Sequence, residues 1–256
     1  GVGLAYKCFG NAKVKLRPLD LNEVVANMKL DTSAGLTAIG KKKIEVIEYA
    51  LTRAEQIIRG IKKARPCLCG LRTQTKDDGN DYHNLEEVKL HYKGKTRLVW
   101  MYPAEMTIVE GMFAIALIDY FKKRKTPMTI GIRKGNMGAR IYHEIQSRKR
   151  VYALDYSKFD STISKDLILQ AFKILKTNFC EFDSFQAKAW DKVVYYFVHT
   201  TIVMPDGNLY AGKEHGVPSG SFFTQLIDSV VNVILMGATS KKFSLMLGVN
   251  NFVVLG

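Results

Sequence analysis

The sequence of 256 residues predicts a mixed α/β (α+β) fold. Two observations predict it: short β-rich runs alternate with helical patterns, and their order is not a plain βαβ repeat. Hydrophobic residues make up 47% of the chain and charged residues 24%, which is typical of a globular protein and excludes a disordered tail. The length permits a substantial core in one or two domains.

The N-terminal half contains one clear helical pattern and one predicted hairpin. Apolar side chains recur at helical spacing over residues 42–59, and Gly60 is expected to end that helix. The polar stretch 65–84 is predicted to be a loop. Residues 88–92 and 97–101 are β-rich and are predicted to form a hairpin.

After the hairpin, Pro103 is predicted to open a helix that runs to about residue 121. The region that follows is predicted to begin and end with a strand. The β-rich run 151–155 follows, and the apolar run 251–256 closes the chain. Between these two strands we expect helices over 164–179, capped by Ser164, over 185–199 and over 221–236, and a hairpin of 201–204 with 209–211.

The charge of the chain indicates a polyanionic partner. Lys and Arg number 38 against 24 acids, a formal net charge of +14. Such a field attracts nucleic acid, the commonest polyanion, although a basic protein without a specific partner is the alternative. No apolar run reaches the roughly 18 residues that a membrane helix needs. Because the chain begins at Gly1 and not at Met, we expect its N-terminus to lie inside a longer product.

The four cysteines are too few for a disulfide framework and fit a reducing compartment. A zinc site would have to combine Cys67 and Cys69 with His83 and His91. The Cys-x-Cys spacing is shorter than the two to four intervening residues typical of structural zinc sites. Two unrelated thiols in a loop are therefore the preferred interpretation.

Two aspartates follow the predicted strand 151–155. Asp155 ends that strand, and Asp160 lies past a tight turn. Ligands of α/β sheets commonly bind at the carboxyl ends of strands, so both carboxylates are expected to face one crevice. Phosphoryl transfer with two metal ions needs carboxylates of this kind. The alternative is a strand end followed by an ordinary Asp turn.

A Gly/Pro/Ser loop over residues 216–221 opens the predicted helix 221–236. Its backbone N–H groups would be available to an anion such as phosphate, and its glycines allow close approach. Thr224, Asp228 and Asn232 follow at intervals of four residues and therefore share one helix face. Either this polar row meets a ligand such as a ribose hydroxyl, or it faces water.

These residues carry a resemblance to a family. Asp155-x4-Asp160, followed by Ser219-Gly220-x3-Thr224, resembles motifs A and B of viral RNA-dependent RNA polymerases. Two segments are especially similar to these motifs in the polymerases of partitivirus-like double-stranded RNA viruses. Their sequences are Asp-Tyr-Ser-Lys-Phe-Asp-Ser and Gly-Val-Pro-Ser-Gly-Ser-Phe-Phe-Thr-Gln. The segment 95–100 with Pro103 resembles motif F, and 31–35 resembles motif G. Residues 252–256 resemble the lead-in to motif C, where the family continues with Asp-Asp.

The resemblance implies the right-hand polymerase fold, with fingers over residues 1–149, an incomplete palm over 150–256 and no thumb. It implies template-directed RNA synthesis by two-metal nucleotidyl transfer with Mg²⁺ or Mn²⁺. The implied partners are an RNA template and product, ribonucleoside triphosphates and a viral capsid protein, without a membrane. The implied location is the host cytoplasm and the interior of the viral particle. Without the motif C aspartates, the chain as given is expected to be inactive.

The resemblance also implies a role for individual residues. Asp155 would bind the catalytic metal ions, and Asp160 with the motif B helix would recognise the ribose 2′-hydroxyl. Many family members carry asparagine at the position of Asp228, so either Asp228 or Asn232 would serve the ribose. The resemblance further implies that Lys95 and Arg97 contact the triphosphate, and that Ser219 and Gly220 lie against the template and the nascent base pair. Thr224, on the motif B helix, would bind the nucleotide, and Thr32, Ser33 and Gly35 would contact the template.

Two other classes of protein are weighed against this interpretation. A reverse transcriptase shares the palm, but it tends to carry Gln-Gly in place of Ser219-Gly220 and a bulky aromatic in place of Asp160. A non-catalytic RNA-binding or capsid protein explains the charge of +14. It does not explain the pairing of two aspartates with a Ser-Gly loop and a threonine.

Overall fold

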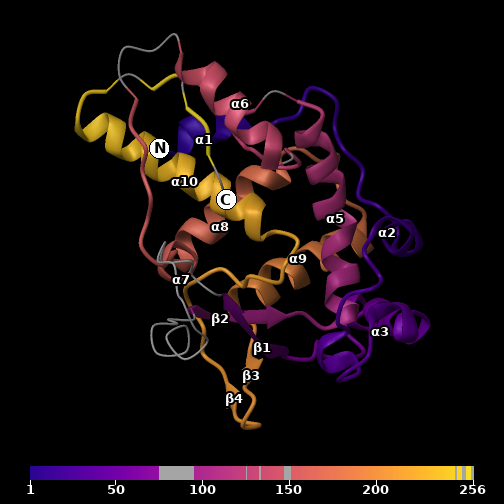
Figure 1. The fold of residues 1–256 in the computed structure, drawn as a ribbon. Coiled ribbons are helices and arrows are strands. Elements are labelled where there is room, and N and C mark those ends of the chain that lie inside the picture. Colours follow the sequence, from indigo (N-terminus) through magenta and orange to yellow (C-terminus); the bar gives the residue numbers. More distant parts are fainter. Residues whose placement is uncertain are drawn as a thin grey trace, which may run out of the picture.

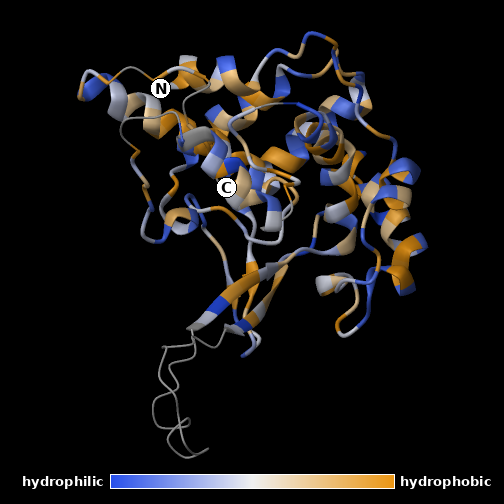
Figure 2. Ribbon diagram, turned by 45° about the horizontal axis from the view of Figure 1, so that its top comes forward, coloured by the Kyte–Doolittle hydropathy of each residue, from blue (hydrophilic) through white to orange (hydrophobic). Residues whose placement is uncertain are grey.

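The computed structural model describes residues 1–74, 95–124, 126–132, 134–146, 151–245, 247–249 and 252–254 (Figure 1). In this part of the chain a body of helices lies beside a small sheet, which extends away from them at one end (Figure 2). The helices are α1 (Val2–Phe9), α2 (Leu21–Asn27), η1 (Gly35–Thr37), η2 (Lys43–Val46), α3 (Ile47–Ile58), α5 (Ala104–Lys122), α6 (Lys134–Ile145), α7 (Phe159–Thr162), α8 (Lys165–Lys176), α9 (Ser184–His199) and α10 (Thr224–Lys242), of which η1 and η2 are 3₁₀-helices.

The sheet joins strands from both halves of the chain. Its order is β2 (Lys95–Met101), β1 (Cys67–Gln74), β3 (Ile202–Val203) and β4 (Leu209–Tyr210). β1 runs antiparallel to β2 and parallel to β3, and β3 and β4 form a hairpin. The predicted hairpin of 201–204 with 209–211 is therefore confirmed.

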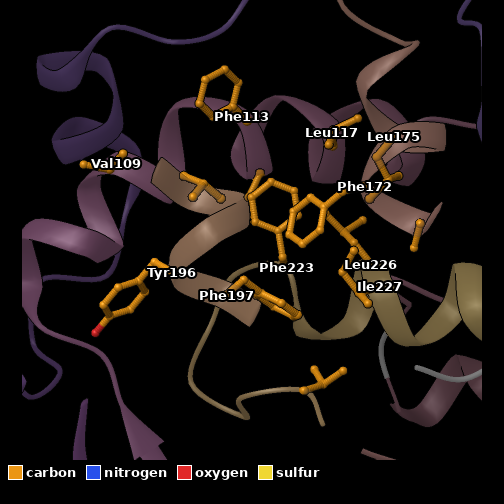
Figure 3. Packing of buried hydrophobic residues seen from close by; sticks show 14 of the residues in the cluster. Val109, Phe113, Leu117, Phe172, Leu175, Tyr196, Phe197, Phe223, Leu226 and Ile227 are labelled. Carbon is orange, nitrogen blue, oxygen red and sulfur yellow. The ribbon is translucent and has the colours of Figure 1, made fainter. Parts of the chain in front are cut away.

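The core is built around α5, which is buried on nearly every side because its sequence is apolar all round. Figure 3 shows the rings of Phe172, Phe197 and Phe223 gathered close together in this core. Phe223, the N-cap of α10, is fully buried, with its ring centroid 4.9 Å from that of Phe172 and 6.0 Å from that of Trp190. Truncating such a ring to alanine costs about 3–5 kcal/mol, so aromatic packing fixes the start of α10.

The other predicted helices are confirmed with shifted ends. The pattern over 42–59 forms a 3₁₀ turn, η2, and then α3, and Gly60 follows with a φ of +79°. Helix α10 begins three residues later and ends six residues later than predicted. Ser164 caps α8 as expected, since its side chain accepts a hydrogen bond from the Leu167 N–H at 3.4 Å. The described helices outside the predicted elements are α1, α2, η1, α6 and α7. None of the described helices is long and apolar enough to cross a bilayer.

Three strand predictions and one loop prediction need correction or lie wholly or partly outside the described residues. Residues 151–155 are not a strand: they are exposed and pair with no described residue, and a β-rich run needs a neighbouring strand to satisfy its backbone groups. The segment 65–84 is not all loop, since its first part forms β1. The predicted strand 88–92 lies outside the described residues, and among the described strands β2 pairs with β1. Of the predicted strand 251–256 only residues 252–254 are described, and among these Val254 forms a single parallel bridge with Met128.

Candidate nucleotide and RNA site

The segment with Asp160 and the Gly/Pro/Ser loop lie side by side. The Val217 N–H donates to the Asp160 carbonyl at 2.7 Å, and the Gly216 N–H donates to the Ile163 carbonyl at 2.7 Å. Gly216 has a φ of +82°, a conformation that other residues rarely adopt. Two segments that sequence analysis assigns to motifs A and B are thus joined through their backbones.

A pocket of about 650 Å³ opens where these segments meet the sheet. Asp160, His215 and Ser219 line one part of it. Trp100 of β2 and Tyr210 of β4 line another. Flat apolar side chains beside carboxylate, imidazole and hydroxyl groups offer both stacking surface and hydrogen-bonding groups, which suits a nucleobase with its sugar.

The loop itself is pressed against β2. The Trp100 N–H donates to Ser219 Oγ at 3.2 Å. A Cβ on Gly220 would lie 1.7 Å from the Trp100 carbonyl oxygen, a distance that no side chain tolerates. Gly220 is therefore required by the close approach of two backbones. The structure brings the motif B-like and motif F-like segments into direct contact.

A buried carboxylate, Glu110 of α5, holds the next residues of the loop. Ser221 Oγ donates to its two carboxylate oxygens at 2.8 and 2.9 Å, and the Phe222 N–H donates at 3.0 Å. Burial raises the pKa of Glu110 to about 8. Sequence reasoning missed this role. The available signal is an acid inside an otherwise apolar helix, since buried acids need partners.

The polar row of α10 faces the protein and not water. Thr224 Oγ1 lies 2.7 Å from the Pro218 carbonyl and 2.9 Å from that of Ser221, so its hydroxyl donates within the loop. Asp228 is 1% exposed, and its Oδ1 has no hydrogen-bond partner among the described residues. Burial, and then the charge of Asp160, raise the pKa of Asp228 to about 8. Asn232 is half-buried.

Asp155 lies apart from this buried arrangement. It is exposed on the extended segment that precedes α7, and the ring of Tyr156 stacks on that of Phe159 at 4.9 Å. Lys158, between the two aspartates, has a φ of +53° and makes the turn. Among the described residues no three Asp, Glu, His or Cys side chains come close enough to hold a metal ion.

Two arginines stand opposite each other on β1 and β2. Arg72 pairs with Arg97, and both are exposed. Side chains alternate along a strand, so Arg97 points to the face opposite Leu98 and Trp100 and does not line the pocket. Like charges directly opposite destabilise a sheet, and an anion between them would relieve that cost. Sequence reasoning missed Arg72. Lys95 lies in β2, but its side chain lies outside the described residues.

The motif G-like segment packs against the end of β2. Lys43 Nζ donates to Thr32 Oγ1 at 2.9 Å and to the Ser33 carbonyl at 2.7 Å. Gly35 has a φ of +60°, and a Cβ there would lie 2.6 Å from the Tyr102 carbonyl oxygen. This segment therefore connects to the same stretch, 95–110, that supports the Ser-Gly loop.

The two central cysteines are structural. Cys67 and Cys69 are buried in β1 and not in a loop, which corrects the preferred interpretation of their setting. Cys67 Sγ lies 3.5 Å from the Tyr196 hydroxyl, and burial raises its pKa to about 12. His83 and His91 of the zinc alternative lie outside the described residues.

The fold is that of a viral polymerase. It matches the RNA-dependent RNA polymerase of a human picobirnavirus with a TM-score of 0.71 and 19% identity, over 100% of this chain and 47% of that chain. The insertion loop deletion mutant of the same polymerase matches with a TM-score of 0.72 and 18% identity, covering 49% of that chain. The right-hand fold that the sequence implied is therefore confirmed.

The sequence matches the viral RNA-dependent RNA polymerase family over residues 9–248, and the chain belongs to that family. It is 27% identical to the RNA-directed RNA polymerase of Cryptosporidium parvum virus 1 over 86% of this chain and 40% of the relative. It is 26% identical to that of White clover cryptic virus 1, over 58% of this chain and 28% of the relative. The chain thus spans less than half the length of these curated relatives.

Proposed function

We propose that this chain forms the fingers and part of the palm of an enzyme that copies an RNA template from ribonucleoside triphosphates. The observation that carries the proposal is the meeting of three motif-like segments at one pocket, where Val217 is bonded to Asp160 and Ser219 to Trp100. Membership of the polymerase family supports it. The proposed boundary between fingers, 1–149, and palm, 150–256, leaves the β3–β4 hairpin, which pairs with β1, on the palm side.

The pocket is proposed to hold the nascent base pair between the loop and the sheet. Ser219, Gly220 and Thr224 would shape the surface that the base pair meets. Asp160, with Asp228 or Asn232, would sense the ribose 2′-hydroxyl, the group that separates RNA from DNA precursors. The buried, unpartnered Oδ1 of Asp228 favours Asp228 over Asn232 for this role, because buried polar atoms normally have partners.

The cationic residues are proposed to bind phosphate groups. Arg97 and the opposing Arg72 lie on the face of the sheet away from the pocket and would neutralise the RNA backbone, with Lys95 on the same strand. This placement does not support the implied contact of Arg97 with the triphosphate. Thr32, Ser33 and Gly35 would contact the template where it enters. The net charge of +14 supports RNA as the partner.

Asp155 is the proposed metal ligand. Viral RNA-dependent RNA polymerases use divalent ions, and an exposed carboxylate is the oxygen ligand that Mg²⁺ or Mn²⁺ prefers. The described residues bring no set of three such ligands together, so they do not by themselves form a two-metal site. Asp155 would supply one ligand only. A viral capsid protein as partner, and the host cytoplasm and viral particle as location, remain proposals from the family.

The first test replaces Asp155 by alanine in a polymerase of the length of its relatives. Nucleotide incorporation on an RNA template should fall below detection, while RNA affinity and thermal stability stay unchanged because Asp155 is exposed. Glu181→Ala, which removes another exposed acid, is the matched control and should retain full incorporation. Unchanged incorporation in Asp155→Ala would refute the metal-binding role.

A non-catalytic RNA-binding protein is the second candidate. The opposed arginines and the basic charge favour it, because both bind RNA without any chemistry. A full-length protein that binds RNA with the expected salt dependence but incorporates no nucleotide under any metal condition would support this candidate.

A further inference from the structure

We infer that Glu110 is a positioning residue for the proposed polymerase reaction: from inside α5 it holds the Ser-Gly loop in the conformation that presents Ser219 and α10 to the pocket. The inference rests on the proposed function. Nothing in the motif resemblance assigns a role to this residue.

The hydrogen bonds of Glu110 at 3.0 Å or less go to the loop, and the Tyr102 side chain also faces its carboxyl group. Both carboxylate oxygens bond Ser221 Oγ, and one also accepts the Phe222 N–H. Ser221 Oγ in turn accepts the Phe223 N–H at 3.0 Å. Glu110 thereby organises backbone N–H groups at the start of α10, where no helix carbonyl is available to them.

The loop is held from two sides by one continuous stretch of chain. Trp100 of β2 fixes Ser219 and leaves no room for a side chain at Gly220, and Glu110 fixes the next two residues. Trp100 and Glu110 are ten residues apart in sequence. A movement of the β2–α5 stretch would therefore be transmitted directly to the surface that meets the nascent base pair.

Another buried acid on the same helix shows that this arrangement is particular to Glu110. Glu105 is also fully buried, but it pairs with Arg65 at 2.7 Å and with Thr37. Among the described residues no cation is bonded to Glu110, so its carboxyl group is expected to be neutral at pH 7, consistent with its pKa of about 8. A neutral acid serves the loop as a hydrogen-bonding partner and not as a charge.

The titratable groups that face Glu110 are Tyr102, Cys67 and Tyr196. Burial raises the pKa of each of them well above that of Glu110, so all three remain neutral while Glu110 titrates. Ionisation of Glu110 above pH 8 would place an unpaired buried charge behind the loop. The inference therefore includes a pH dependence that glutamine at this position would remove.

The experiment compares Glu110→Ala and Glu110→Gln in the full-length polymerase, with Glu105→Gln as the matched buried control. Hydrogen exchange of the peptide 216–226 should become at least about 10-fold faster in Glu110→Ala, because the Phe222 N–H loses its acceptor. Incorporation per enzyme should fall about 10- to 100-fold, as expected when a positioning contact is lost. Glu110→Gln should stay within about threefold of the wild type.

The pH profile separates positioning from general stability. Wild-type incorporation should decline above about pH 8, and Glu110→Gln should show a smaller decline, because Asp228 also has a pKa of about 8 and still ionises. Glu105→Gln is expected to lower thermal stability without changing the exchange of peptide 216–226. Unchanged exchange in Glu110→Ala overturns the inference, and so does faster exchange with unchanged incorporation. A wild-type enzyme without incorporation, but with the predicted exchange pattern, counts instead against the proposed function.

Discussion

The two sides of the candidate site are built in opposite ways. Asp155 lies on an exposed, extended segment that pairs with no described residue, whereas Asp228 is 1% exposed inside α10. The exposed Asp155 contacts solvent or a bound ligand, whereas the protonation and contacts of the buried Asp228 are set by the protein around it. Substitutions on the first side should therefore change chemistry and leave folding alone, while substitutions on the second side should change both.

The largest effect on folding is expected from Gly220→Ala, on the buried side. The new Cβ would meet the Trp100 carbonyl at 1.7 Å, so the loop or β2 must move. Overpacking of this kind costs typically about 1–3 kcal/mol, and a clash between backbones is expected at the upper end. Chemical denaturation should show a free energy of unfolding lower by about 3 kcal/mol.

Gly3→Ala is the matched control for that substitution. A Cβ on Gly3 meets nothing within 4 Å, and the residue lies in α1, where alanine is the better helix former. It should be neutral or slightly stabilising. Equal stability of Gly220→Ala and the wild type would mean that the loop does not press on β2.

The next effect on folding, which depends on pH, is expected when Asp228 is replaced by asparagine. The pKa of Asp228 is raised to about 8 in the folded protein from 3.8. Between these pH values the unfolded chain has lost the proton that the folded chain keeps, so stability falls as pH rises through this window, by roughly 1 kcal/mol per unit. Asp228→Asn has no proton to lose, and its unfolding free energy should fall less between pH 5 and pH 8.

Glu110 also makes stability fall as pH rises, because its pKa is likewise raised to about 8 in the folded protein. Asp228→Asn should therefore remove only part of the pH dependence, and Glu110→Gln another part. The double variant should show the flattest profile. Identical profiles of Asp228→Asn and the wild type would show that Asp228 is already ionised at neutral pH.

The contrast between the two sides also explains what sequence could predict. Local patterns were sufficient for α5, α9 and the β3–β4 hairpin, since caps, turn residues and apolar spacing act within a few residues. They singled out the glycines of the loop, but for the approach of an anion; that Gly220 is required by its contact with β2 was not predicted. The pairing of β1 with β2 and β3 was not predictable, because Cys67–Gln74 has a polar second half and depends on distant partners.

The errors at the site have the same physical origin. The run 151–155 has the composition of a strand, but a strand forms only beside a partner, and the described residues provide none. The role of Glu110 could not be predicted, because its partner Ser221 lies 111 residues away in sequence. Arg72 could be recognised as a candidate phosphate-binding residue only from the register of β1 and β2, which places it opposite Arg97. Long-range contacts therefore set the parts that sequence reasoning missed.

The smallest effect, and the one that links the two sides, is expected from Asp160→Ala. Asp160 is exposed, but its carbonyl accepts the Val217 N–H, and that backbone bond survives the substitution. What is lost is a carboxylate that lines the pocket and a charge that helps to raise the pKa of Asp228. Asp228 should then ionise at lower pH, and the sugar-sensing pair should lose one hydrogen-bonding group.

Competition between ribonucleotides and deoxyribonucleotides measures this loss in the full-length enzyme. Discrimination should weaken by about 10-fold, the equivalent of one hydrogen bond of roughly 1.4 kcal/mol, while incorporation of ribonucleotides continues. Ser161→Ala, at the neighbouring exposed position, tests whether any change in α7 has the same effect. Equal discrimination before and after Asp160→Ala would assign sugar sensing to α10 alone, and the exposed side would then contribute only Asp155 to the reaction.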